Sequence, residues 1–292
     1  MNWIDEAIEH LAKQPICGYA PAETPAVEPT ALAALALLAT GRHEQAAAGL
    51  DWLTKLQSLD GSLGINADTP KPCWPTGWAI LAWSTALKKL PDPTSAWDMA
   101  LGRAVDWILT HRGTKIPRNN DQFEATGHDT MLQGWPWVLG THSWVEPTAI
   151  NTLALQSVGQ TSHPNYLEAI ALLVDRQLPN GGWNYGNTIV FGHELRPHVQ
   201  ATGLALAALG NAKQTHAKTR RSIDWLQRTL SNTTTTSSLC YALMGLAGHG
   251  IRPPDADGWL SAAYRQTVQY NNSPYHMALL VLAAKTDNFV SE

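Results

Sequence analysis

The sequence predicts an all-α fold in which six helix pairs close into one ring, an (α/α)6 toroid formed as a single domain by residues 1–292. A repeated unit is the first observation that predicts it: the pentapeptide Val-Glu-Pro-Thr-Ala occurs at 27–31 and again at 145–149. The second is an alternation of nearly uncharged Ala/Leu-rich segments with amphipathic ones. Helix pairs that cannot bury their apolar faces alone do so by stacking on neighbouring copies.

Six apolar segments are expected to form the inner wall of the ring. A helix that is apolar all round must be buried all round, and such segments lie at about 30–40, 76–88, 148–158, 200–210, 236–248 and 275–285. The repeated pentapeptide opens two of them. Proline suits the first turn of a helix, and a glutamate before it suits the positive helix end.

Amphipathic segments follow the inner ones and are expected to form the outer wall, at about 45–57, 97–111, 164–177, 215–230 and 256–269. This leaves the outer wall one helix short. Residues 2–14 form a further amphipathic segment with no apolar partner before it, and the last apolar segment has no amphipathic partner after it. We therefore expect the N-terminal helix to close the ring against the C-terminal helix.

A second repeat places the functional rim. Gln, three residues and Gly follow three outer segments, as Gln14…Gly18, Gln57…Gly61 and Gln177…Gly181. Since all inner helices run the same way, these turns share one rim with the inner-helix starts. The longest connections, at about 58–74, 113–146 and 178–197, lie on that rim, and long loops on a rigid scaffold usually carry function.

Composition and charge exclude several classes of protein. Only 15% of residues are charged and the net charge is −4, which gives no basis for nucleic-acid binding. Three widely spaced cysteines form neither a disulfide framework nor a Cys-x-x-Cys zinc pattern. The first residues do not resemble a signal peptide, and no apolar run reaches the roughly 20 residues of a membrane span. We expect a cytoplasmic protein without a transmembrane segment, and peripheral membrane contact stays open.

The third turn carries a resemblance to a known family. Gln177…Gly181-Gly-Trp183 resembles the QW motif of squalene-hopene and oxidosqualene cyclases. The toroid and its repeats also resemble the β subunits of protein prenyltransferases. This resemblance implies a terpene-cyclase-like protein that binds or converts an isoprenoid, or another apolar small molecule, in a central aromatic-lined cavity. The Asp-x-Asp-Asp acid motif of class II cyclases is absent, and the length suits one barrel only.

Four side chains are candidates for acid–base catalysis: Glu28, Glu146, Asp129 and His128. The two glutamates precede proline at equivalent helix starts, so stabilisation of the helix dipole is the alternative to a role as an acid with a raised pKa. Asp129 lies in the longest loop, where a proton donor and a turn-capping residue are both consistent with the sequence.

Two further groups are candidates for substrate binding. His193, Arg196, His198 and Gln200 precede and open the fourth inner helix and form a candidate anion site. Aromatic residues at inner-helix starts and in rim loops could line an isoprenoid channel, stabilise a carbocation or stack on sugars; they are Trp74, Trp78, Trp135, Trp137, Trp144, Trp183 and Tyr185.

Three alternatives stand beside the terpene-cyclase hypothesis. In a zinc-dependent prenyltransferase-like subunit with a partner subunit, the resemblance implies Cys240 and His276 as zinc ligands, although Ser238 replaces the expected carboxylate. A carbohydrate-active toroid would need two nearby carboxylates across a cleft. A non-catalytic binding scaffold would explain the missing acid motif.

Overall fold

The computed structural model describes residues 2–117, 127–210 and 217–285 and confirms the all-helical toroid. The inner helices are α2 (Val27–Ala39), α4 (Thr76–Lys89), α7 (Val145–Ser157), α9 (Val199–Gly210), α11 (Thr236–Ala247) and α13 (Pro274–Lys285). The outer helices are α1 (Trp3–Lys13), α3 (His43–Leu56), α5 (Ser95–Thr110), α8 (Pro164–Asp175), α10 (Ala217–Thr229) and α12 (Ala256–Tyr270). Each matches its predicted segment to within a few residues.

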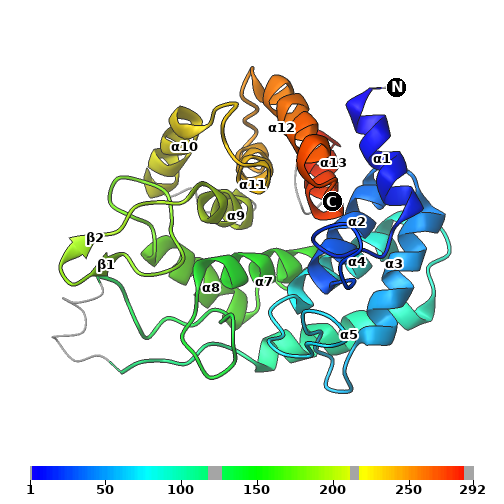
Figure 1. Cartoon of the computed structure of the whole chain (residues 1–292). Coiled ribbons are helices and arrows are strands. Elements are labelled where there is room, and N and C mark those ends of the chain that lie inside the picture. The colour runs from blue at the N-terminus through cyan, green and yellow to red at the C-terminus, as the bar shows by residue number, and fades with distance from the viewer. Residues whose placement is uncertain (1, 118–126, 211–216, 286–292) are drawn as a thin grey trace.

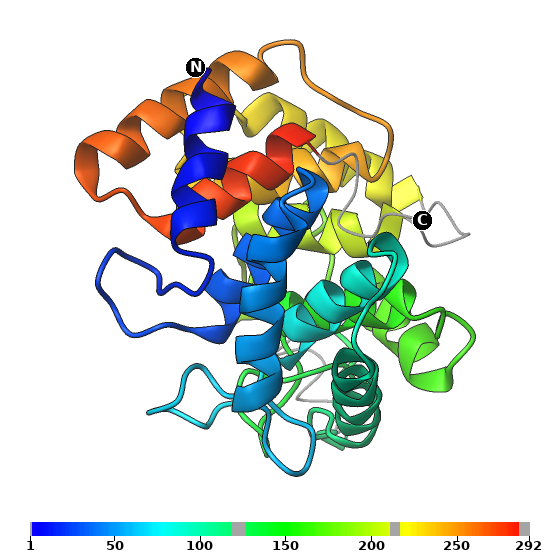
Figure 2. The ribbon, with the colours of Figure 1, turned by 90° about the vertical axis from the view of Figure 1, so that its right-hand side faces the viewer.

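The inner helices form a closed ring. Each packs against the next in the order α2, α4, α7, α9, α11 and α13, and α13 packs back against α2. The N-terminal helix completes the outer wall, because α1 lies beside α13, as Figures 1 and 2 both show. The Trp3 ring also packs against Tyr264 of α12, whose hydroxyl donates to Glu6 at 2.8 Å. Ring closure by the two ends of the chain is confirmed.

A threonine in the first turns of four inner helices ties each helix to the rim loop before it. Its hydroxyl accepts a hydrogen bond from the N–H of one loop residue and donates to the C=O of the same residue. The pairs are Thr30 with Cys17, Thr76 with Leu63, Thr148 with Trp135 and Thr202 with Trp183. Because all four threonines are fully buried, these bonds fix the loops without competition from water.

Loss of one of these threonine hydroxyl groups is expected to destabilise the fold. Thr148→Val keeps the shape but leaves the buried Trp135 N–H without its acceptor, which costs about 1–3 kcal/mol. Urea unfolding followed by circular dichroism measures the loss. Thr54→Val is the matched control, because the Thr54 hydroxyl only donates to a carbonyl of its own helix, α3. Equal destabilisation by the two substitutions would show that the hydrogen bonds between Thr148 and the rim loop add no more stability than a hydroxyl bonded within its own helix.

The Gln-x3-Gly repeat pins rim turns to the next outer helix. Gly61 and Gly181 adopt φ values of +92° and +94°, which favour glycine. A Cβ at either position would lie 2.3 or 2.7 Å from a backbone oxygen of Arg103 or Arg221, on α5 or α10. The Gln57 amide donates to the Gly61 carbonyl and to a carbonyl of α5, at 2.9 and 2.8 Å. The motif therefore sets the positions of rim loops and outer helices.

Side chains fill the interior of the ring below the rim. Every residue of α7 is buried, and α2 is buried from Val27 to Leu38. A helix lining a channel wide enough for water would expose one face to it. The central cavity that the resemblance implies is therefore absent along the described helices α2 and α7, and space for a ligand must be sought at the rim.

Candidate functional site

Side chains from all six inner helices meet at the rim end of the ring. Helices α2, α7, α9 and α13 each contribute their second residue. Helices α4 and α11 each contribute one residue from their first two turns. We call this group the central cluster; it consists of Glu28, Trp78, Glu146, Gln200, Tyr241 and Tyr275. Because its members come from every side of the ring and interact with one another, they must lie at its axis.

Glu28 accepts more hydrogen bonds than Glu146, the other carboxyl group of the cluster. It is 8% exposed. The Tyr19 hydroxyl donates to its Oε2 at 2.7 Å and the Tyr241 hydroxyl to its Oε1 at 3.3 Å. Burial raises the pKa of Glu28 to about 7, against the hydrogen bonds from Tyr19, Tyr241 and Trp78, which lower it. These donors favour the ionised form of Glu28 relative to an equally buried carboxyl group without them.

Glu146 is held differently. Burial and then the nearby charge of Glu28 raise its pKa to about 7, and a hydrogen bond from Gln200 lowers it. Its Oε1 atom is buried and accepts no hydrogen bond from any described residue. An unsatisfied buried oxygen costs less on a neutral carboxylic acid than on a carboxylate. The two environments therefore favour protonated Glu146 beside ionised Glu28.

This pair can supply one acid and one base near neutral pH. Two coupled carboxyl groups lose their protons in two steps that belong to the pair. Between those steps the pair holds one proton, and the hydrogen bonds described above favour its residence on Glu146. A pair of carboxyl groups whose environments move their two pKa values apart is typical of acid–base catalysis.

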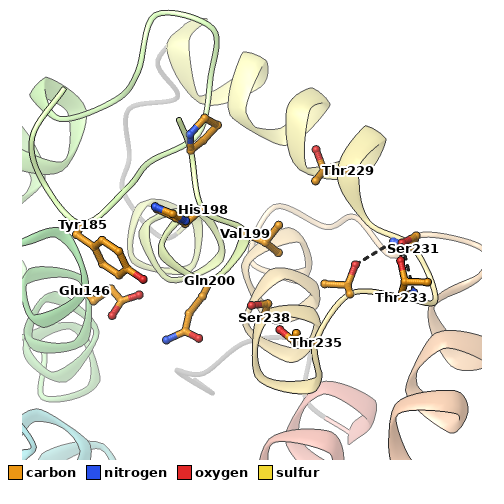
Figure 3. Close-up of a pocket in the computed structure, with 12 residues that line it drawn as sticks. Glu146, Tyr185, His198, Val199, Gln200, Thr229, Ser231, Thr233, Thr235 and Ser238 are labelled. Carbon is orange, nitrogen blue, oxygen red and sulfur yellow. Dashed lines mark hydrogen bonds between the residues drawn. The ribbon is translucent and has the colours of Figure 1, made fainter. Parts of the chain in front are cut away.

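A cavity of about 460 Å³ opens above Glu146, and we call it the rim pocket. Figure 3 shows Glu146, Tyr185 and Gln200 on one side and a run of Ser and Thr side chains on the other. Hydroxyl, amide and imidazole groups dominate its walls, which are formed by Glu146, Tyr185, Pro197, His198, Val199, Gln200, Thr229, Ser231, Thr233, Thr234, Thr235 and Ser238. Such a lining suits a polar ligand.

A smaller cavity of about 200 Å³, the side pocket, adjoins the rim pocket. Its lining residues are Trp144, Asn184, Tyr185, Gly186, Asn187, Leu195, Arg196 and His198. Tyr185 and His198 belong to both cavities, and their rings lie 4.8 Å apart between centroids. The structure thus brings together five members of the predicted binding set, Gln200, His198, Arg196, Tyr185 and Trp144. His193 lies apart from them on the hairpin of β1 (Ile189–Val190) and β2 (His193–Glu194) and lines neither cavity.

The predicted tryptophans do not line one cavity. Trp183 is fully buried and Trp135 is 1% exposed, and their indole N–H groups donate to carbonyls of the outer helices α8 and α5. Trp74 and Trp137 form an edge-to-face pair elsewhere on the rim, with ring centroids 4.8 Å apart. Trp183 as a substrate-binding residue, and one cavity lined by all these aromatic residues, are therefore wrong. The rings of Trp135 and Trp183 instead anchor rim loops on outer helices, a role that the sequence pattern alone does not distinguish from ligand binding.

Asp129 and His128 lie in another part of the rim. The Asp129 N–H donates to the Asp175 carboxylate at 2.9 Å, and Arg176 donates to the Asp129 carbonyl at 3.1 Å. These contacts place Asp129 against the C-terminal end of α8. The structure does not bring it into the central cluster with Glu28 and Glu146.

Cys240 and His276 do not gain the further ligands that a zinc site needs. No group of three or more His, Cys, Asp and Glu side chains within the described ranges could hold a metal ion. Burial raises the pKa of the Cys240 thiol and lowers that of His276, so both favour their neutral forms. The predicted pair does not fit tetrahedral zinc, which takes at least three protein ligands.

Sequence reasoning missed the tyrosines of the site. Tyr19, Tyr241 and Tyr275 surround Glu28, yet none was expected to be a site residue. One signal was available for Tyr275: it is the second residue of its inner helix, the register that Glu28 and Glu146 occupy in theirs. The rim hydroxyls of residues 229–238 had no such signal, because serine and threonine are common in any turn.

Comparisons with known proteins identify the fold. No model of a protein family and no curated protein sequence matches the chain. Among solved structures, a glycosidase in complex with glucose has a TM-score of 0.64 at 11% identity, covering 99% of this chain and 97% of the other. The type II terpene cyclase MstE from Scytonema, in complex with its product merosterolic acid A, has a TM-score of 0.58 at 13% identity, covering 98% of each chain.

The chain has the toroid fold of these enzymes. At 11% and 13% identity the likeness concerns the fold alone. Two enzyme classes with different substrates share the scaffold, so function must be argued from the side chains at the rim. None of the described helices is long and apolar enough to cross a bilayer.

Proposed function

We propose that the chain is a carbohydrate-active enzyme that hydrolyses a glycosidic bond by acid–base catalysis at Glu146 and Glu28. The pairing of two buried glutamates with raised pKa values below a polar pocket carries this proposal. Protonated Glu146 gives its proton to the glycosidic oxygen as the bond to the anomeric carbon breaks. Ionised Glu28 stabilises the positive charge on that carbon and takes the proton of the water that attacks it.

The side chains that line the rim pocket favour a sugar as its ligand. A pyranose ring carries hydroxyl groups around its edge, and the pocket offers hydroxyl, amide and imidazole partners for them. Tyr185 is 50% exposed and presents an aromatic ring at the same wall, against which the apolar face of a sugar can stack. The similarity over nearly full length to a glycosidase that binds glucose is consistent with this choice.

Isoprenoid cyclisation is the second candidate, and one observation favours it. Glu28 is surrounded by aromatic rings, those of Tyr19, Trp78, Tyr241 and Tyr275. Aromatic faces stabilise cations, and a protonated carboxyl group beside them could start a cyclisation. A terpene cyclase of similar fold binds geranylgeranyl dihydroxybenzoate. The polar rim pocket and the filled interior favour the sugar.

A substrate screen separates the two candidates. The purified chain is incubated with a panel of oligosaccharides and, separately, with squalene and geranylgeranyl dihydroxybenzoate. We expect new reducing ends in at least one oligosaccharide reaction and unchanged isoprenoids, detected by mass spectrometry. A cyclised isoprenoid formed without any sugar product would contradict the proposal and support the second candidate.

A further inference from the structure

We infer that the sugar substrate has at least two units and carries a negative group, which binds in the side pocket at Arg196. This rests on the proposed function, because it takes the unit cleaved at Glu146 to lie in the rim pocket. The two cavities share Tyr185 and His198. A chain cleaved in one cavity therefore reaches the other by passing this pair of rings.

The side pocket is built by fixed backbone. The Val145 N–H donates to the Tyr185 carbonyl at 2.9 Å, which ties the loop to the start of α7. The His198 N–H donates to the Trp183 carbonyl at 2.7 Å, which ties the other wall to the start of α9. The Asn184 side chain closes the turn between these walls by accepting from the Gly186 N–H at 2.8 Å. The cavity is thus formed before a ligand arrives, which reduces the entropy lost on binding.

Charge in the side pocket favours an anion. Arg196 is a cation, and none of the lining residues of this cavity is acidic. Helix α9 begins at Val199, directly after His198, which lines both cavities, so its positive end lies at the wall that they share. A guanidinium group binds a carboxylate or sulfate through two parallel hydrogen bonds. The rim pocket differs, since Glu146 lies in its wall.

The division of charge assigns a role to each cavity. A neutral part of the substrate fits beside Glu146, where a carboxylate on the substrate would be repelled by ionised Glu28. The acidic part of the substrate, a uronate or a sulfated sugar, fits beside Arg196. The site would therefore select acidic oligosaccharides over neutral ones of the same linkage.

Binding of two matched monosaccharides tests this selection. Glucuronate and glucose differ only in the carboxylate at C6, and their dissociation constants are measured by NMR titration at low salt. We expect the wild-type chain to bind glucuronate about tenfold more tightly than glucose. Arg196→Gln should abolish the preference. Arg265→Gln, which removes a surface arginine on α12 that contacts Ser261, should leave it unchanged.

Three results would overturn the inference. They are equal binding of both sugars by the wild-type chain, a preference that survives Arg196→Gln, and an Arg196-dependent affinity for inorganic pyrophosphate above that for glucuronate. The last result would assign the anion site to an isoprenoid diphosphate instead. Because the readout is binding and not turnover, a chain that hydrolyses neutral glycosides without this preference would retain the proposed function and lose only the side-pocket assignment.

Discussion

Replacing Glu146 with glutamine is expected to lower kcat for glycoside hydrolysis by about 10²–10⁴-fold, the contribution typical of a general acid. Glutamine keeps the shape of the side chain and its hydrogen bond with Gln200 but has no proton to give to a leaving group. The helical fold should persist, because the neutral amide resembles the protonated acid that we infer at this position. Initial rates on the substrate found by the screen measure the loss.

Two comparisons make that result specific. Glu44→Gln, at an exposed position in the first turn of α3, should leave kcat unchanged. Leaving groups that need no protonation, such as a dinitrophenolate, should recover much of the lost rate in the Glu146 variant, as expected when only the acid is missing. If Glu146→Gln hydrolyses ordinary substrates at the wild-type rate, Glu146 is not the general acid.

The buried glutamates are also expected to make the free energy of unfolding fall as the pH rises. The pKa of Glu146 rises from the ordinary 4.5 to about 7 in the folded chain, so between these values the folded state binds more protons than the unfolded state. The resulting stability is fully present below about pH 4.5 and is lost as the pH passes through 7. A shift of this size corresponds to about 3 kcal/mol.

Glu146→Gln isolates this contribution, because its side chain stays neutral at every pH. The difference in unfolding free energy between variant and wild type should shift in favour of the variant by about 3 kcal/mol between about pH 4.5 and pH 8, measured by urea unfolding. Titrating groups that do not interact with Glu146 cancel in that difference. The Glu44→Gln variant should show a difference that hardly changes with pH. A constant difference for Glu146→Gln would mean that the glutamate titrates normally in the folded chain.

The architecture was predictable because the signals for it are periodic. Helices buried on all sides must be apolar on all sides, and α2 and α9 carry that property in their sequences. The duplicated pentapeptide gave the register of the inner helices. In both copies the valine N–H donates to a carbonyl of the next rim loop, Ile65 for Val27 and Tyr185 for Val145. Each copy of the pentapeptide therefore makes the same backbone hydrogen bond to a rim loop, and it also places a glutamate at the helix start.

The composition of the site was only partly predictable. Glu28 and Glu146 were found from the repeat, but their meeting depends on the curvature of the ring, which places α2 and α7 on either side of α4. Apart from the helix register that Tyr275 shares with the two glutamates, no local pattern identified the aromatic residues that face the site. Trp183 anchors a loop and Tyr275 faces the axis, although both lie on the same rim. That distinction is set by the direction of each side chain around the closed ring.

Direct titration of the two glutamates is the measurement that tests the acid–base pair most closely. Side-chain carboxyl carbons labelled with ¹³C report each protonation step by NMR, and the Glu28→Gln and Glu146→Gln variants assign the signals. We expect the pair to titrate near the pKa of about 7 that burial gives each carboxyl group, with Glu146 keeping the last shared proton. Titration of both glutamates near the ordinary value of 4.5 would contradict the shared proton and with it the proposed catalysis.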